Sequence, residues 1–198
     1  MRQPMRHLLL PLLLITPLAA CVNLGSKPPE RLLSLTAKAS LDGGTVRTST
    51  TGRSLIVGVP ETPRMLETNR VPVQMDDISV AYVKGGQWVD QPGRLFQRLL
   101  SEVIAAKTDR VILDPGLFGG EPGTRLSGEL LRFGADARTR QAVITYDATL
   151  LGPDGSTVMK KRFSAARPLN GIDATGVGNA LNEAANEVAG QVAEWVGQ

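Results

Sequence analysis

Cysteine and histidine are almost absent from this chain of 198 residues, which contains one of each, Cys21 and His7. His7 lies in an N-terminal stretch that we expect to be removed, so the mature chain has no histidine. This absence excludes a Ser-His-Asp triad, a Cys-His catalytic pair and a zinc site built on imidazole. Most catalytic routes are therefore closed to the mature protein.

The chain also lacks an apolar run long enough to cross a bilayer, which takes roughly 20 apolar residues. The apolar stretch Leu8–Leu18 is shorter and is interrupted by two prolines. It follows the basic residues Arg2 and Arg6 and ends in two alanines. A positive start, a short apolar core and small residues at its end are typical of a secretory signal. We predict that residues 1–20 are a cleaved signal peptide.

Neither sign of charge predominates in the chain that remains. Removing Arg2 and Arg6 from the 22 basic residues leaves 20, against 19 acidic residues. The sequence pI of about 9.3 therefore overstates the basicity of the mature protein. Because nucleic-acid binding needs a concentrated basic face, we expect no nucleic-acid partner. The length and the hydrophobic fraction of 42% fit one folded domain.

The single cysteine directly follows the small residues that end the signal. The tetrapeptide Leu18-Ala19-Ala20-Cys21 resembles the lipobox of bacterial lipoproteins. In a lipobox the thiol receives a diacylglycerol, the chain is cut before the cysteine, here between Ala20 and Cys21, and the new amine is acylated. The alternative is a secreted protein with one free thiol, which is unusual in an oxidising compartment. We predict that Cys21 is lipidated, and Val22 favours the outer membrane because the enterobacterial inner membrane retains chiefly lipoproteins with Asp after the cysteine.

The mature chain divides into a tether and one domain. Residues 21–29 comprise the lipidated cysteine and a short, polar, proline-containing tether. Two or more acyl chains make membrane residence stable, so the lipid would hold the protein at the membrane surface. Residues 30–198 are the expected periplasmic domain.

Hydrophobic patterning in residues 30–198 predicts both strands and helices. Helical spacing of apolar residues predicts a helix from Pro92 through Ile104 and a second from about Thr175 to the C-terminus. Short apolar or alternating runs predict strands at 31–37, 54–60, 70–75, 78–83, 110–115, 125–133, 141–151 and 157–163. Residues 152–156 form a turn between the last two of these strands, and we expect the last three strands to form a meander.

Two clusters of like charge each allow a functional and a structural interpretation. Asp76-Asp77 is the obvious candidate for a catalytic pair, but adjacent residues of an extended chain point to opposite faces, which favours a turn between two strands. Lys160-Lys161-Arg162 is either a patch facing lipid headgroups or a set of charges that protects a sheet edge from pairing. We favour the turn and the edge.

Residues 55–104 carry a family resemblance. They resemble the auxiliary lipoproteins of ABC-type lipid transport systems, of the paraquat-inducible protein C type. The recurring features are a strand ending in proline, a short turn, a second strand, an aromatic residue ahead of a tryptophan and then an amphipathic helix, found here at Val57–Pro60, Met65-Leu66, Val71–Met75, Tyr82, Trp88 and Arg94–Ile104.

The resemblance implies a fold and a function. The fold is a single two-layer α+β domain, with a mixed, largely antiparallel sheet packed by two main helices, similar to the amino-terminal domain of the Tol translocation protein. The function is that of a non-catalytic accessory, anchored in the outer membrane, of an MCE-domain protein and its ABC transporter permease and ATPase, which carry phospholipid across the periplasm. It implies no cofactor or metal and leaves a homo-oligomer open. The alternative is an assembly or pilot lipoprotein for another outer-membrane complex.

Within that motif, Tyr82 and Trp88 are candidate contacts with a partner. Aromatic residues between a strand and a helix make good interface anchors. An aromatic residue beside a helix start is more often part of the core, with its polar atom satisfied. We favour the core for Trp88.

Overall fold

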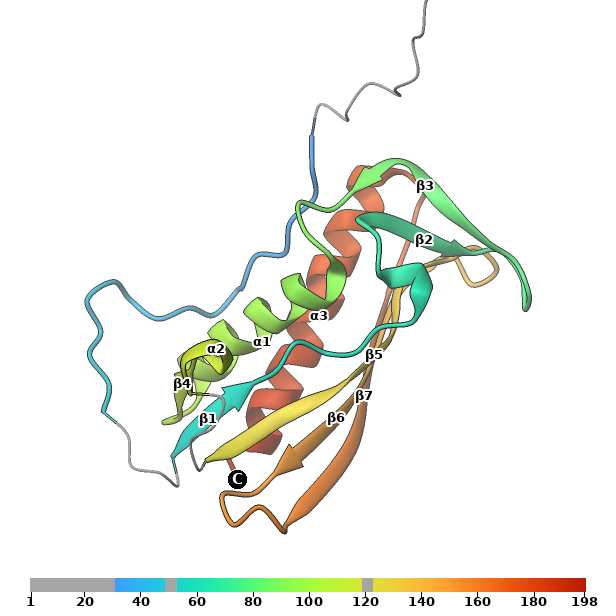
Figure 1. The fold of residues 1–198 in the computed structure, drawn as a ribbon. Helices are drawn as coiled ribbons and strands as arrows, with labels where there is room; N and C mark the ends of the chain where they lie inside the picture. Colours follow the sequence, from blue (N-terminus) through green and yellow to red (C-terminus); the bar gives the residue numbers. More distant parts are fainter. Residues whose placement is uncertain (1–30, 49–52, 119–122) are drawn as a thin grey trace, which may run out of the picture.

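The computed structural model describes residues 31–48, 53–118 and 123–198. In these ranges seven strands form one mixed sheet, and two long helices lie side by side across one of its faces (Figure 1). The strands are β1 Ser54–Val57, β2 Arg70–Gln74, β3 Val80–Gln87, β4 Val111–Leu113, β5 Thr124–Asp136, β6 Gln141–Leu151 and β7 Val158–Pro168. The helices are α1 Pro92–Lys107 and α3 Ala174–Val196, with the short turns η1 Arg64–Leu66 and α2 Pro115–Phe118.

Strand β5 is the centre of the sheet. One of its edges pairs antiparallel with β6, which in turn pairs antiparallel with β7. Its other edge pairs in parallel with β1 near its start and with β2 near its end. Strand β4 adds in parallel to β1, and β3 adds antiparallel to β2. The predicted two-layer domain with a mixed, largely antiparallel sheet and two main helices is confirmed.

Alternating side chains explain why the sheet has one covered and one open face. Along β6 every second residue is buried and those between are only partly covered. Successive strand residues point to opposite faces, so the buried set lies under the helices and the other set faces solvent. The buried set is Ala142, Ile144, Tyr146, Ala148 and Leu150.

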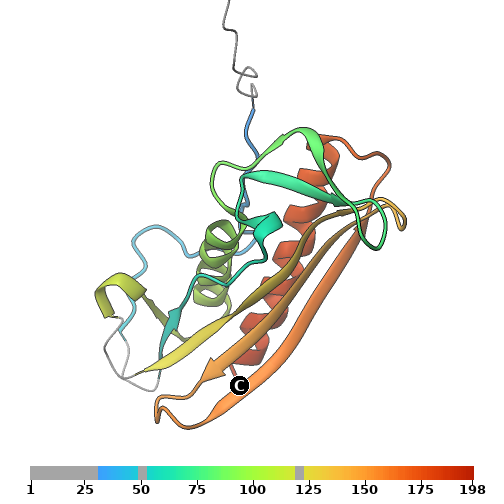
Figure 2. The ribbon, with the colours of Figure 1, turned by 45° about the vertical axis from the view of Figure 1, so that its right-hand side comes forward.

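Both helices follow their sequence signals. Helix α1 has Pro92 at its first turn and buries the predicted apolar face, which includes Phe96 and Leu100. Helix α3 is capped by Asp173, whose carboxylate accepts a hydrogen bond of 2.9 Å from the Gly176 amide. Figure 2 shows α1 and α3 packed on the same face of the sheet.

Residues 31–48 differ from the prediction, which placed a strand at 31–37. The segment lies over the helices and turns at residues 42–45, and its one described strand-like pairing is the bridge from Leu33 to Trp88. Asn182 and Asn186 of α3 accept hydrogen bonds from the Thr36 and Lys38 amides at 2.8 and 2.7 Å. The Thr36 and Lys38 amides therefore bond to side chains of a helix, where the prediction expected them to bond to a neighbouring strand. The predicted strand at 31–37 is wrong.

Two glycines in β5 permit close approaches between strands. Gly128 has a φ of +155°, and a Cβ there would lie 2.1 Å from the Asp147 carbonyl oxygen. A Cβ on Gly134 would lie 2.4 Å from the Pro72 carbonyl oxygen, where β2 joins the sheet. Any larger residue at either position would push the neighbouring strand away.

Asp136 organises the turn between β5 and β6. Its carboxylate accepts hydrogen bonds of 3.1 Å from the amides of Arg138 and Thr139 and pairs with Arg132 at 3.0 Å, while the residue is only 6% exposed. The Thr139 amide, followed by the Arg132 guanidinium, holds the pKa of this carboxyl below its ordinary value. The charged form is therefore favoured by folding.

We expect Asp136→Ala to lower the free energy of unfolding by about 1–3 kcal/mol at pH 7, because two turn amides lose their acceptor. A carboxyl with a lowered folded pKa stabilises the fold above its unfolded pKa, near 3.8, and loses that contribution as the pH falls through the folded pKa. Urea unfolding at pH 7 and pH 3 should show a smaller difference from wild type at pH 3. The matched control is Asp77→Ala on the surface, and an equal deficit for Asp136→Ala at both pH values would contradict the assignment.

Candidate functional site

The predicted lipidation and cleavage residues, Cys21 and Ala20, lie outside the described residues, as do the signal peptide and tether. Their roles stay predictions. The candidate partner contacts and the two charged clusters all lie within the described ranges.

Trp88 is part of the hydrophobic core. It is 1% exposed, and its ring centroid lies 5.2 Å from that of Phe133. The Trp88 amide donates to the Asn69 carbonyl at 2.7 Å, which fixes the chain between β3 and α1. A side chain buried in this way presents no surface to a partner in this structure.

Tyr82 lies on β3, and its ring is only partly covered. The guanidinium carbon of Arg70 on β2 lies 4.0 Å from the ring centroid, in a cation–π contact. The two strands are antiparallel, so this contact joins side chains on one face of the hairpin. Of the two aromatic candidates, Tyr82 is the one that a partner can reach.

Asp76 and Asp77 form the predicted turn. Asp76 accepts hydrogen bonds from the Ile78 and Ser79 amides at 2.9 and 2.8 Å, and the Ile78 bond above all lowers the pKa of its carboxyl. Asp77 pairs instead with Arg138 at 2.5 Å. The two carboxylates have separate structural partners, which is the arrangement of a turn.

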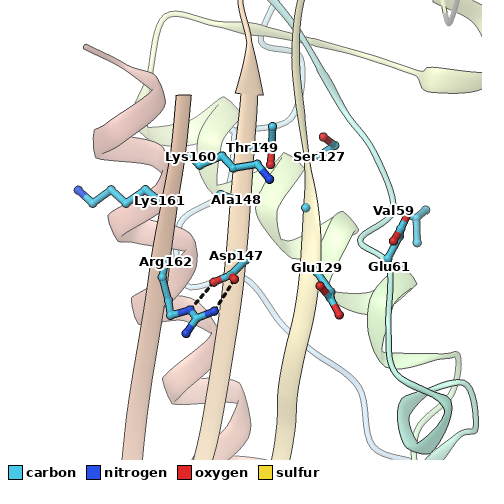
Figure 3. A pocket seen from close by; sticks show the side chains of 11 residues that line it. Val59, Glu61, Ser127, Glu129, Asp147, Ala148, Thr149, Lys160, Lys161 and Arg162 are labelled. Carbon is cyan, nitrogen blue, oxygen red and sulfur yellow. Dashed lines mark hydrogen bonds and ion pairs between the residues drawn. The ribbon is translucent and has the colours of Figure 1, made fainter. Parts of the chain in front are cut away.

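The basic cluster at 160–162 lies on β7, an edge strand, as predicted. Arg162 makes a two-pronged ion pair with Asp147 on β6, with nitrogen-to-oxygen distances of 2.5 and 2.6 Å. This pair lowers the pKa of the Asp147 carboxyl and raises that of the guanidinium. Figure 3 shows Lys160 reaching across β6 toward Thr149, whereas Lys161 points away from the sheet face.

The open face of the sheet is hollowed beside this cluster. The hollow has a volume of about 690 Å³ and is bounded by β5, β6, β7 and the chain that follows β1. Cross-strand register brings Glu129, Asp147 and Arg162 into one row on this face. Val59 and Glu61 form the far wall (Figure 3). The hollow is the candidate site, and its mixture of charges and apolar surface suits contact with another molecule.

None of the side chains in the far wall or the central row was singled out from the sequence, apart from Arg162. The alternation along β6 could have placed Asp147 on the open face. The neighbours of Asp147 depend on the register of three strands, which alternation alone does not give. Within the described ranges, no three His, Cys, Asp or Glu side chains gather closely enough to hold a metal ion.

Comparison with protein families matches residues 34–193 to the ABC-type transport auxiliary lipoprotein component. The chain belongs to this family. As an auxiliary lipoprotein it is a component associated with ABC-type transport. The family resemblance stated from residues 55–104 is confirmed over most of the chain.

Two solved structures share the fold of the auxiliary lipoprotein. Protein XCC0632 from Xanthomonas campestris, of the family designated DUF330, is 19% identical with a TM-score of 0.66, and the match covers 84% of this chain and 95% of that one. An uncharacterised protein is 16% identical with a TM-score of 0.65, over 76% of this chain and 96% of the other. The likeness to the Tol translocation protein stays a prediction.

No curated protein matches the auxiliary lipoprotein. Among the helices of the described residues, none is both long and apolar enough to span a membrane.

Proposed function

We propose that this auxiliary lipoprotein is a non-catalytic accessory of an MCE-type ABC system that carries phospholipid across the periplasm. In this proposal the lipid on Cys21 holds the protein in the outer membrane, with the domain facing the periplasm. The observation that carries the proposal is the family match over residues 34–193, together with the resemblance of residues 1–21 to a lipoprotein signal and lipobox.

The anchor is supported by the coincidence of three sequence features. Basic residues, a short apolar core and a cysteine directly after Ala20 occur in the order that a lipoprotein signal requires. Val22 supports delivery to the outer membrane. The tether then leads to Arg31, where the described structure begins.

The non-catalytic role is supported by the side chains available. After residue 20 the chain has no histidine, and its only thiol belongs to the residue proposed to carry lipid. The Asp76 and Asp77 carboxylates are engaged in a turn and an ion pair. What the open face offers is a broad surface of mixed charge.

We expect the full-length protein, purified through a C-terminal tag from detergent-solubilised envelopes of its own host, to retain an MCE-domain protein together with the permease and ATPase of the same system. Mass spectrometry of the eluate identifies these partners. A tagged lipoprotein of unrelated fold, purified in parallel, controls for adhesion to detergent micelles. Recovery of a secretin or an outer-membrane barrel without an MCE-domain protein would favour the assembly-lipoprotein alternative and contradict the proposal.

A further inference from the structure

The outer edge of β7 is unpaired in the described part of the chain. The strand pairs with β6 along all 11 of its residues, and no described strand lies on its other side. An unpaired edge presents a row of free N–H and C=O groups, which is a template for an added strand. The edge of β7 is therefore long enough to accept several residues of another chain.

The first half of β7 is exposed on both of its faces. Residues 158–162 are all exposed, whereas exposure and burial alternate from Phe163 onward, where the strand passes under α3. Figures 1 and 2 show the β6–β7 turn extending past the C-terminal end of α3. Val158 and Met159 leave 57% and 46% of their surface in solvent. A strand added here would gain apolar contacts as well as backbone hydrogen bonds.

Two basic residues of β7 have acidic partners. Arg162 pairs with Asp147, and Arg167 pairs with Glu183 and Glu187. Lys160 and Lys161, in this half of β7, make no ion pair within the described structure, although Asp147 lies close enough to Lys160 for the lysine to contribute to lowering the pKa of that carboxyl. Instead, the Lys161 Nζ lies over the Phe163 ring, 5.2 Å from the ring centroid.

We propose that the β7 edge at residues 158–162 binds an extended acidic segment of a partner protein as an added strand. Residues directly opposite each other on neighbouring strands approach within about 5 Å, and opposite charges there are favourable. Lys160 and Lys161 lie on opposite faces of β7, so the complementary segment carries two successive acidic residues flanked by apolar ones. The Lys160 side chain, which here lies across β6 (Figure 3), turns toward the added strand when that strand binds. Backbone hydrogen bonds supply the affinity, and the two lysines select the partner.

An acidic segment is favoured over two other possible ligands of this edge, a second copy of β7 and a lipid surface. A second copy of β7 paired across this stretch would set lysines against lysines, and like charges directly opposite are destabilising. A lipid surface would have to reach the β6–β7 end of the sheet, which is remote from the first described segment, where Leu33 bridges to Trp88 (Figure 1). That last step rests on the anchor of the proposed function, whereas the unpaired edge and its charge do not.

The test uses the full-length lipoprotein in non-ionic detergent and a fluorescein-labelled peptide, Thr-Val-Glu-Glu-Val-Thr with both ends blocked. We expect fluorescence polarisation to report binding that weakens about tenfold or more in the variant Lys160→Glu/Lys161→Glu, because two attractive pairs become repulsive. The same variant should bind the peptide that has lysines in place of the glutamates. The matched control, Lys38→Glu/Lys84→Glu, changes the net charge equally at two exposed lysines away from β7 and should bind like wild type.

A peptide with the same side chains and N-methylated backbone amides distinguishes strand addition from simple attraction. It keeps the charge but cannot donate backbone hydrogen bonds, so it should not bind. Equal binding of the methylated peptide, or no binding of either, would overturn the proposal. The proposal would also be overturned if vesicles of anionic lipid bind the wild-type protein, but not the Lys160→Glu/Lys161→Glu variant, while the peptide binds neither. The assay contains no transporter, so a failed co-purification would contradict the proposed function and leave this result standing.

Discussion

Replacing Trp88 with alanine is expected to lower the free energy of unfolding by about 3–5 kcal/mol. The side chain is 1% exposed and packs against Phe133, at the point where β3, the start of α1 and the segment around Leu33 meet. Truncation there removes apolar contacts and leaves a cavity in the core, into which the surrounding structure relaxes only partially. Urea unfolding followed by circular dichroism measures the loss.

The control variant Trp88→Phe separates packing from hydrogen bonding. The indole Nε1 is buried, with no hydrogen-bond partner in the described part of the structure, so phenylalanine forfeits no such bond and keeps an aromatic ring beside Phe133. We expect it to recover more than half of the stability lost in Trp88→Ala. If Trp88→Ala instead has the same free energy of unfolding as wild type but no longer co-purifies with the MCE-domain protein, the side chain is an interface anchor. Its assignment to the core would then be wrong.

The helices and the three-strand meander could be predicted because their signals are local. Pro92 and the apolar spacing that follows fix α1 within a few residues, and the turn between β6 and β7 lies where glycine and aspartate occur in the sequence. These elements bury one stripe or one face, so periodicity in the sequence reports the packing directly.

The segment at 31–37 shows what periodicity leaves undetermined. Its alternating Leu33, Leu35 and Ala37 do pack against the core, as a strand's would. An alternating pattern specifies an extended chain with one covered face, but here α3 covers the segment, and the backbone of Thr36 and Lys38 bonds to Asn182 and Asn186 instead of to a neighbouring strand. Nothing local in the sequence distinguishes a helix surface from a neighbouring strand.

The open face could not be assembled from the sequence for a related reason. Asp147 and Arg162 are 15 residues apart and meet only because β6 and β7 pair in one particular register. Glu61 reaches the same hollow through a parallel bridge to Glu129, a contact between distant segments. Residues on one strand can be assigned to a face by alternation, whereas a surface made of three strands needs the pairing itself.

Removing the lipid anchor is expected to abolish function while leaving the domain folded. The wild-type protein should carry a diacylglycerol and a fatty acyl group on an N-terminal Cys21 peptide, as measured by mass spectrometry of the membrane fraction. A variant in which a signal peptide without a lipobox exports residues 22–198 should no longer be found in the membrane fraction. Each buried methylene contributes about 0.8 kcal/mol, so three acyl chains hold far more tightly than a single chain, which binds only marginally.

The unanchored form tests whether location is all that the lipid supplies. It should unfold in one cooperative transition and still co-purify with the MCE-domain protein, because the helices, the sheet and the β7 edge all lie after the tether. It should nevertheless fail to restore envelope integrity in a deletion strain, since it cannot hold that partner against the outer membrane. The variant Val22→Asp is the matched control: it keeps the lipid, is retained in the inner membrane, and should fail equally. Full rescue by the unanchored form would show that the anchor is dispensable, and rescue by Val22→Asp alone would show that any membrane suffices.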